Sequence, residues 1–283
     1  MNLVQYFNRF NTTLGKQIMP ELESEIRQRI KEKGWTTEEI MIVHKKLGSI
    51  ANWFFEDRRR FVSRKNPSEV YCLLEMLQSV AEILEAHQLL QVSTIVLSGW
   101  LDYDSKTDSL FRKDRSDMTI SIPKESRDRS LLDYCKQALD RLPYFLYPID
   151  VEFLGSGIVF DADGIECELP NVTWVSGRTE NVHFIEVYTQ SDAWLPYTLL
   201  GESQMEVWIN NAKRLRAALQ EIQNSLGIQA YTDGYTRYAV CDEDFTLTNL
   251  TSGDDEIVPI NEVFSNFEEW KQTNQQLLKD NQF

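Results

Sequence analysis

The spacing of apolar residues changes near residue 91, and this change restricts the possible folds more than any other feature of the 283-residue chain. Over segments 36–54 and 66–84, apolar residues recur every three or four positions, which is the period of an amphipathic helix. Beyond residue 91, short alternating or continuous apolar runs predominate, and these are typical of strands. We therefore predict a helical region over residues 1–91 and an α+β domain over residues 92–283.

The later part of the chain shows the signals of an antiparallel or mixed β-sheet with flanking helices. Asp163 and Gly164 lie between two apolar runs, and an Asp-Gly pair in that position predicts a β-hairpin. A capping-box spacing at Ser203 and Glu206 precedes an apolar stripe at helical period that ends before Gly227, so we expect a packed helix there. The predicted fold class is α+β, with the helical N-terminal region packed on the C-terminal sheet.

The negative charge of the chain lies in its later half. The net charge is -15, and residues 143–283 carry 23 Asp and Glu but only 7 Lys and Arg. Such a surface repels the phosphate backbone of nucleic acids, so direct nucleic-acid binding is disfavoured. It suits a basic protein partner, because long-range attraction speeds association. It also suits solubility alone, which is the favoured interpretation of the charge by itself.

The sequence indicates neither a membrane nor an oxidising compartment. No stretch approaches the roughly 20 apolar residues of a membrane helix, and the start of the chain lacks the basic and apolar blocks of a signal peptide. Four widely separated Cys without a CxxC motif indicate reduced thiols. We therefore predict a cytoplasmic protein that does not bind a membrane.

Motifs for catalysis, nucleotide binding or metal binding are absent, so we predict no cofactor and no metal, and favour a protein without enzymatic activity. The alternative is a metal-dependent nucleotidyltransferase-like enzyme, intact or degenerate. Such enzymes carry a Gly-Ser element, resembled here at 98–99, and then carboxylates that hold two metal ions. Asp117, Asp150 and Glu152 would be those carboxylates. Such enzymes have a second carboxylate two residues after the first, and this chain has Thr119 at that position, so one metal ligand is missing. If the protein is not such an enzyme, we expect Asp117 on a surface turn. Asp150 and Glu152 would then face outward from an edge strand.

One segment, FFEDRRRFVSRK at 54–65, combines aromatic residues with a dense run of cations. Three interpretations are open: a solvated helix end whose cations suit the helix dipole, pairing with the acidic later half, or contact with phosphate. We favour the helix end. The cations are Arg58, Arg59, Arg60, Arg64 and Lys65.

The segment SDAWLPYTLLGESQMEVWINNAKRL at 191–215 places aromatic residues on an irregular connection in front of a helix. Trp and Tyr combine apolar area with a polar group and recur at binding sites. Asp192, Trp194 and Tyr197 are therefore candidates for a partner surface. For the segment as a whole we favour packing in the core, with a partner surface as the second interpretation.

Residues 186–226, with a Trp-Leu-Pro run before an Asn-Ala-x-Arg-Leu helix, resemble a stretch of bacterial immunity-type proteins from toxin–immunity systems. The resemblance implies a cytoplasmic binding protein that neutralises a basic toxin, or another cationic protein, by occlusion. It carries over Trp194 and Tyr197 as binding residues. To these we add Asp192 and the loop carboxylates Asp254, Asp255 and Glu256 because of the charge pattern.

Overall fold

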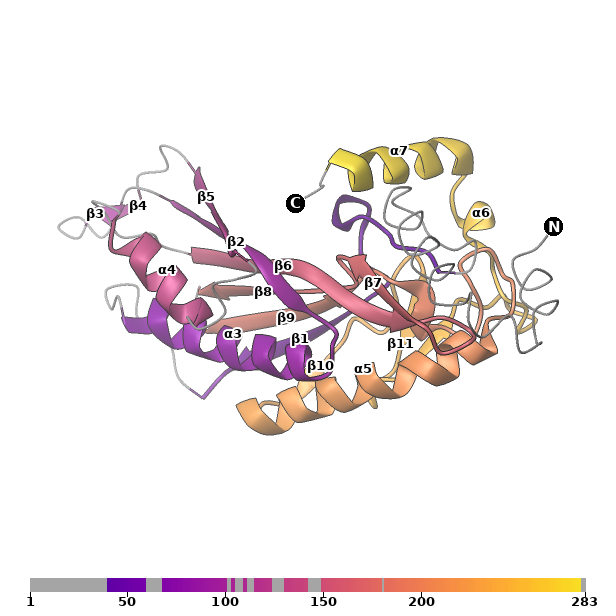
Figure 1. Ribbon diagram of the computed structural model, residues 1–283, viewed down its shortest axis with the longest axis horizontal. Helices are drawn as coiled ribbons and strands as arrows, with labels where there is room; N and C mark the ends of the chain where they lie inside the picture. The colour runs from indigo at the N-terminus through magenta and orange to yellow at the C-terminus, as the bar shows by residue number, and fades with distance from the viewer. Residues whose placement is uncertain are drawn as a thin grey trace, which may run out of the picture.

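The computed structural model is organised around one large antiparallel sheet (Figure 1). Its strands are β1 Ala51–Asp57, β2 Gln91–Trp100, β5 Arg115–Ser121, β6 Ile149–Phe160, β7 Glu166–Pro170, β8 Thr173–Thr179, β9 His183–Thr189 and β10 Ala230–Tyr231. They run in the order β10-β1-β9-β8-β6-β2-β5, and β7 pairs with the second half of β6. The structure describes residues 40–59, 68–100, 103–104, 109–110, 115–123, 130–141, 149–179 and 181–280.

The hydrophobic core lies between the inner face of this sheet and two long helices, α3 and α5. α3 spans Ser68–Ala86 and α5 spans Met205–Leu226, and Figure 1 shows them side by side along the sheet. The apolar stripe of α3 presses closely on β8, since a β-carbon added at Gly177 would lie 2.8 Å from Leu77 Cδ1. A third helix, α4 over Leu131–Leu139, packs beside α3.

Shorter elements complete the described chain. Helix α7, over Phe267–Asp280, lies on the opposite side of the sheet from α3 (Figure 1). There it holds the segment before β1, because the Asn274 side chain accepts from His44 N at 2.8 Å and donates to Ile42 O at 3.0 Å. The remaining elements are short: η1 Lys45–Leu47, β3 Tyr103–Asp104, β4 Ser109–Leu110, η2 Asp192–Trp194, β11 Ala239–Cys241, β12 Leu247–Asn249 and α6 Ile260–Val263.

The helix predicted over 36–54 is wrong within the described residues. In its place the chain forms η1 and then β1, which pairs with β9 on one side and β10 on the other. Ala51, Trp53 and Phe55 are buried and their neighbours are half-buried, which is the alternation of a strand. The sheet therefore takes strands from both sides of residue 91. The second predicted helix is confirmed as α3, whereas residues 1–39 lie outside the described part of the chain.

Other sequence predictions for the fold are confirmed. The class is α+β, and the hairpin at Asp163 and Gly164 joins β6 to β7. α5 ends at Gly227, whose φ of 61° is a left-handed conformation that suits glycine. Its N-cap is Gln204 rather than Ser203, without a side-chain capping bond. None of the described helices combines the length and apolar character needed to cross a bilayer.

Candidate functional site

The connection between β9 and α5 is buried and held by side-chain hydrogen bonds. The Asp192 carboxylate accepts from Met41 N at 2.6 Å and from Leu199 N at 3.2 Å. The Gln204 side-chain amide donates to the carbonyl oxygens of Asp192 at 2.7 Å and Leu195 at 3.0 Å. These bonds tie the segment before β1, the connection and the start of α5 into one unit.

The structure corrects the expectation that Asp192 and Trp194 face a partner. Both side chains are buried, and Trp194 is part of the core, where η2 packs on α5. The guanidinium carbon of Arg214 lies 6.0 Å from the Trp194 ring centroid. Core packing, the interpretation favoured for this segment from the sequence, is what the structure shows for these two residues. Tyr197 is half-buried, and its backbone exchanges two hydrogen bonds with the Asn249 side chain, at 3.1 and 2.8 Å.

Asp192 gives the stability of the fold a pH dependence. Burial raises the pKa of its carboxyl group to about 7, and the N–H donors of Met41 and Leu199 oppose that shift. In an unfolded chain an Asp carboxyl titrates at a pKa of about 3.9. Between these two pKa values the folded state therefore binds more protons. We predict that the contribution of this group to the free energy of unfolding is largest below about pH 4 and falls as the pH rises to about 7.

Urea unfolding of the wild type and of Asp192→Asn, between about pH 4 and pH 8, measures this contribution. Other titrating groups cancel in the difference between the two proteins. The stability of the wild type relative to the variant should decrease as the pH rises through this interval and then level off. A difference that stays constant over the interval would contradict the raised pKa of Asp192.

Two segments form an acidic end of the molecule, residues 197–209 and 249–263. They lie side by side, since Ile260 N donates to Leu199 O at 2.8 Å and a β-carbon at Gly201 would lie 3.2 Å from a Pro259 side-chain atom. Neither segment contains a Lys or an Arg. The carboxylates of the acidic end are all exposed, and they include the three predicted in the loop: Glu202, Glu206, Asp254, Asp255, Glu256 and Glu262.

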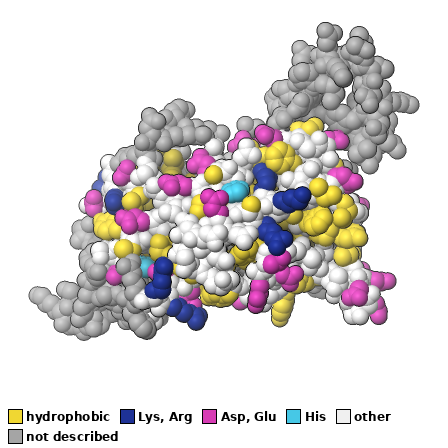
Figure 2. Space-filling model, turned by 90° about the horizontal axis from the view of Figure 1, so that it is seen from below, with side chains coloured by type: hydrophobic (Ala, Val, Ile, Leu, Met, Phe, Trp, Pro, Cys, Tyr) yellow, Lys and Arg dark blue, Asp and Glu magenta, His cyan; other side chains and the backbone are white. Residues whose placement is uncertain are grey.

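The acidic end also exposes apolar side chains. In the described part of the chain, six large apolar residues are exposed, and four of them belong to the acidic end. Figure 2 shows hydrophobic side chains gathered toward the end at which α5 begins. Protein–protein interfaces combine apolar side chains with polar and charged ones, and the acidic end exposes both kinds. The four residues are Leu200, Met205, Ile209 and Val263.

The three carboxylates of the nucleotidyltransferase alternative share one face of the sheet but stand apart. Ser98 pairs with Asp117 on one side and with Asp150 on the other, so the two Asp lie two strands apart, about 10 Å. Arg178 binds Asp150 at 2.8 Å, and Lys45 binds Glu152 at 2.7 Å. No group of three possible metal ligands occurs among the described residues. In this geometry the three carboxylates cannot hold one pair of metal ions.

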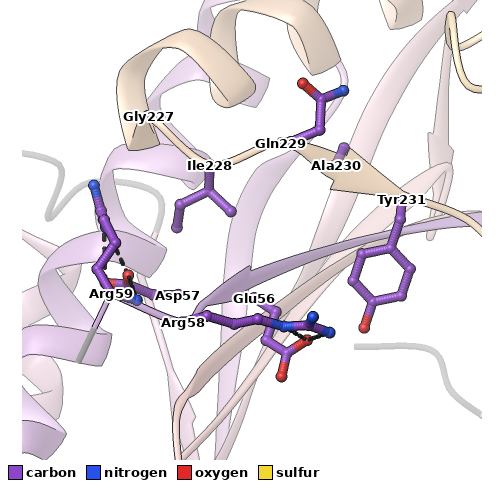
Figure 3. A pocket seen from close by; sticks show the side chains of 9 residues that line it. All are labelled: Glu56, Asp57, Arg58, Arg59, Gly227, Ile228, Gln229, Ala230 and Tyr231. Carbon is purple, nitrogen blue, oxygen red and sulfur yellow. Dashed lines mark hydrogen bonds and ion pairs between the residues drawn. The ribbon is translucent and has the colours of Figure 1, made fainter. Parts of the chain in front are cut away.

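A cleft of about 620 Å³ opens where β1 ends, beside the turn from α5 into β10 (Figure 3). Two arginines of the basic segment line it, each paired with a carboxylate two positions earlier. Arg58 donates to Glu56 through Nε at 2.7 Å, and Arg59 donates to Asp57 through Nε at 2.6 Å. The favoured helix end is therefore wrong at these residues, which follow a strand. Arg60, Arg64 and Lys65 lie outside the described residues.

Sequence reasoning missed this cleft, although the order Glu-Asp-Arg-Arg contains a signal for the pairing. β1 ends at Asp57, and Arg58 and Arg59 lie in the turn that follows it. In that turn each arginine side chain reaches back to the carboxylate two positions earlier. The helix predicted for this segment concealed that relation.

Comparisons with known proteins give no relative. No protein-family model matches the chain, and neither a curated protein nor a solved structure matches it. Function is therefore inferred from the geometry of the described residues.

Proposed function

We propose that the protein binds a cationic protein through its acidic end and blocks a functional surface of that partner. The observation that supports the proposal is the composition of this end. The two segments together expose six carboxylates and four large apolar side chains, and they contain no Lys or Arg. In this proposal the protein acts in the cytoplasm as a bacterial immunity-type protein, and the cationic partner is a basic toxin.

The two kinds of side chain have different roles in this mechanism. The carboxylates attract a basic surface over a distance, which raises the association rate at low salt. The apolar side chains then lose their water against the partner and slow its dissociation. Ile209 is 53% exposed and Leu200 is 42% exposed, so both are available for such burial. Asp192 and Trp194 act beneath this surface, as the support of the connection that carries Leu200.

Removing three charges from the acidic end should weaken partner binding by about tenfold or more at low salt, and much less at high salt. The variant combines Asp254→Asn, Asp255→Asn and Glu256→Gln, which keep the size of each exposed side chain. Affinity capture from the native host identifies the partner. Titration of the purified partner at two salt concentrations then measures the affinity of each variant.

A matched variant removes three exposed charges elsewhere, by Glu82→Gln and Glu85→Gln on α3 and Asp133→Asn on α4. It changes the net charge of the protein equally and should bind almost as the wild type does. The proposal fails if capture at low salt recovers no cationic protein. It also fails if both triple variants lose the same affinity, because net charge rather than the acidic end would then determine binding.

A further inference from the structure

We propose that the cleft at the end of β1 binds a small molecule that carries a phosphate or carboxylate group on an aromatic ring. The volume of the cleft, about 620 Å³, lies within the range of small-molecule sites. It is lined by residues 56–59 at the end of β1 and by residues 227–231 between α5 and β10. Figure 3 shows the Arg58 guanidinium extending along this cleft toward Tyr231.

Arg58 supplies the group that recognises an anion. Its Nε and Nη2 atoms both donate to Glu56 Oε2, at 2.7 and 2.5 Å. A guanidinium carries five N–H groups, so three remain on the edge that faces away from Glu56. The side chain is 77% exposed. This outer edge has the fork geometry that binds a phosphate or carboxylate through two parallel hydrogen bonds.

Glu56 and Asp57 fix the two guanidinium groups. Arg59 binds Asp57 through Nε at 2.6 Å and Nη2 at 3.1 Å, and its Nη1 lies 3.5 Å from the position of a β-carbon at Gly227. Each carboxylate occupies the inner edge of its arginine, so an incoming anion meets the outer edges. An arginine that is already oriented loses less entropy when it binds a ligand.

The opposite wall supplies the surface for a ring. Its apolar members are Ile228, Ala230 and Tyr231; the first two are almost fully buried, so Tyr231 provides the exposed apolar surface. Tyr231 is 42% exposed, and its ring packs against Phe54 of β1 with 5.1 Å between the ring centroids. Phe54 in turn packs against Phe184 of β9 at 5.5 Å. This row of rings holds Tyr231 in place and leaves it accessible from the cleft, where an aromatic ligand can stack.

The cleft and the acidic end are independent sites. α5 begins at the acidic end and finishes at Gly227 beside the cleft, and its 22 residues span about 33 Å. A variant at one end therefore leaves the other unchanged. The two proposals can fail separately.

Calorimetric titration of the full chain with phenyl phosphate and with benzoate tests the proposal. Both should bind, phenyl phosphate should bind more tightly than inorganic phosphate, and benzyl alcohol should give no detectable heat. Arg58→Gln should weaken binding by about tenfold, because it removes a charge-assisted pair of hydrogen bonds. The substitution lies on an exposed side chain, and an unchanged thermal melt would confirm that the variant is folded.

Arg216→Gln is the matched control, since Arg216 also pairs with a carboxylate, Asp244 at 2.7 Å, and is half exposed, but lies outside the cleft. It should bind phenyl phosphate as the wild type does. The proposal is overturned if the wild type binds neither aryl anion, or if Arg58→Gln and Arg216→Gln bind alike. Equal affinity for inorganic phosphate and phenyl phosphate would overturn the role of the ring wall.

Discussion

Replacing Gly155 with alanine should destabilise the protein by about 3 kcal/mol or more, because the new methyl group has no space. Gly155 lies on β6, opposite a register shift between Val92 and Thr94 of β2. A β-carbon at this position would lie 1.8 Å from Gln91 O. The clash is with backbone, which a side-chain rotation cannot relieve. β2 and β6 are neighbouring interior strands of the sheet, so separating them disturbs the pairing on which the core depends.

Gly253→Ala is the matched control for this prediction. Gly253 lies in the exposed loop between β12 and α6, and a β-carbon there would have nothing within 4 Å. Its substitution should change the free energy of unfolding by less than about 0.5 kcal/mol. Urea unfolding of both variants measures the contrast. Equal stability of the two variants would show that β2 and β6 can separate at Gly155 without cost.

The elements that could be predicted from the sequence are those whose signal is local. α3 and α5 have long stripes at helical period, and the turn at Gly164 and the end at Gly227 have residues with special backbone freedom. β1 could not be predicted in this way. Its apolar residues fit both a helical and an alternating period, and the choice depends on β9, more than a hundred residues away. Pairing with a distant strand overrides local preference here.

The candidate sites divide in the same manner. The exposure of the loop at 254–256 follows from its polar composition and Gly253, and the sequence indicates it directly. The burial of Asp192 depends on Met41, which is 151 positions away in the sequence. The backbone N–H of Met41 donates a hydrogen bond to the Asp192 carboxylate. A Trp on an irregular connection is compatible with core and surface alike. The sequence therefore marks the segment around Trp194 as a candidate site. It does not determine which of its side chains are buried and which face solvent.

Trp194→Ala should lower the free energy of unfolding by about 4 kcal/mol, because it leaves a large cavity in the core. Trp194 is 1% exposed and lies on η2, which packs against α5. The side chain fills the space under the connection, next to the Arg214 guanidinium that also stacks 4.5 Å from the Phe160 ring centroid. Atoms around the cavity can relax only in part, since β6 and α5 hold them from both sides. Urea unfolding measures the loss.

Ile209→Ala on α5 separates the role of the core from that of the surface. Ile209 is 53% exposed, so this substitution should change stability by less than about 0.5 kcal/mol and should weaken binding of the cationic partner. Trp194→Phe keeps most of the buried volume and should retain both stability and binding better than Trp194→Ala does. If Trp194→Ala instead kept the stability of the wild type and lost the partner, Trp194 would be a surface anchor.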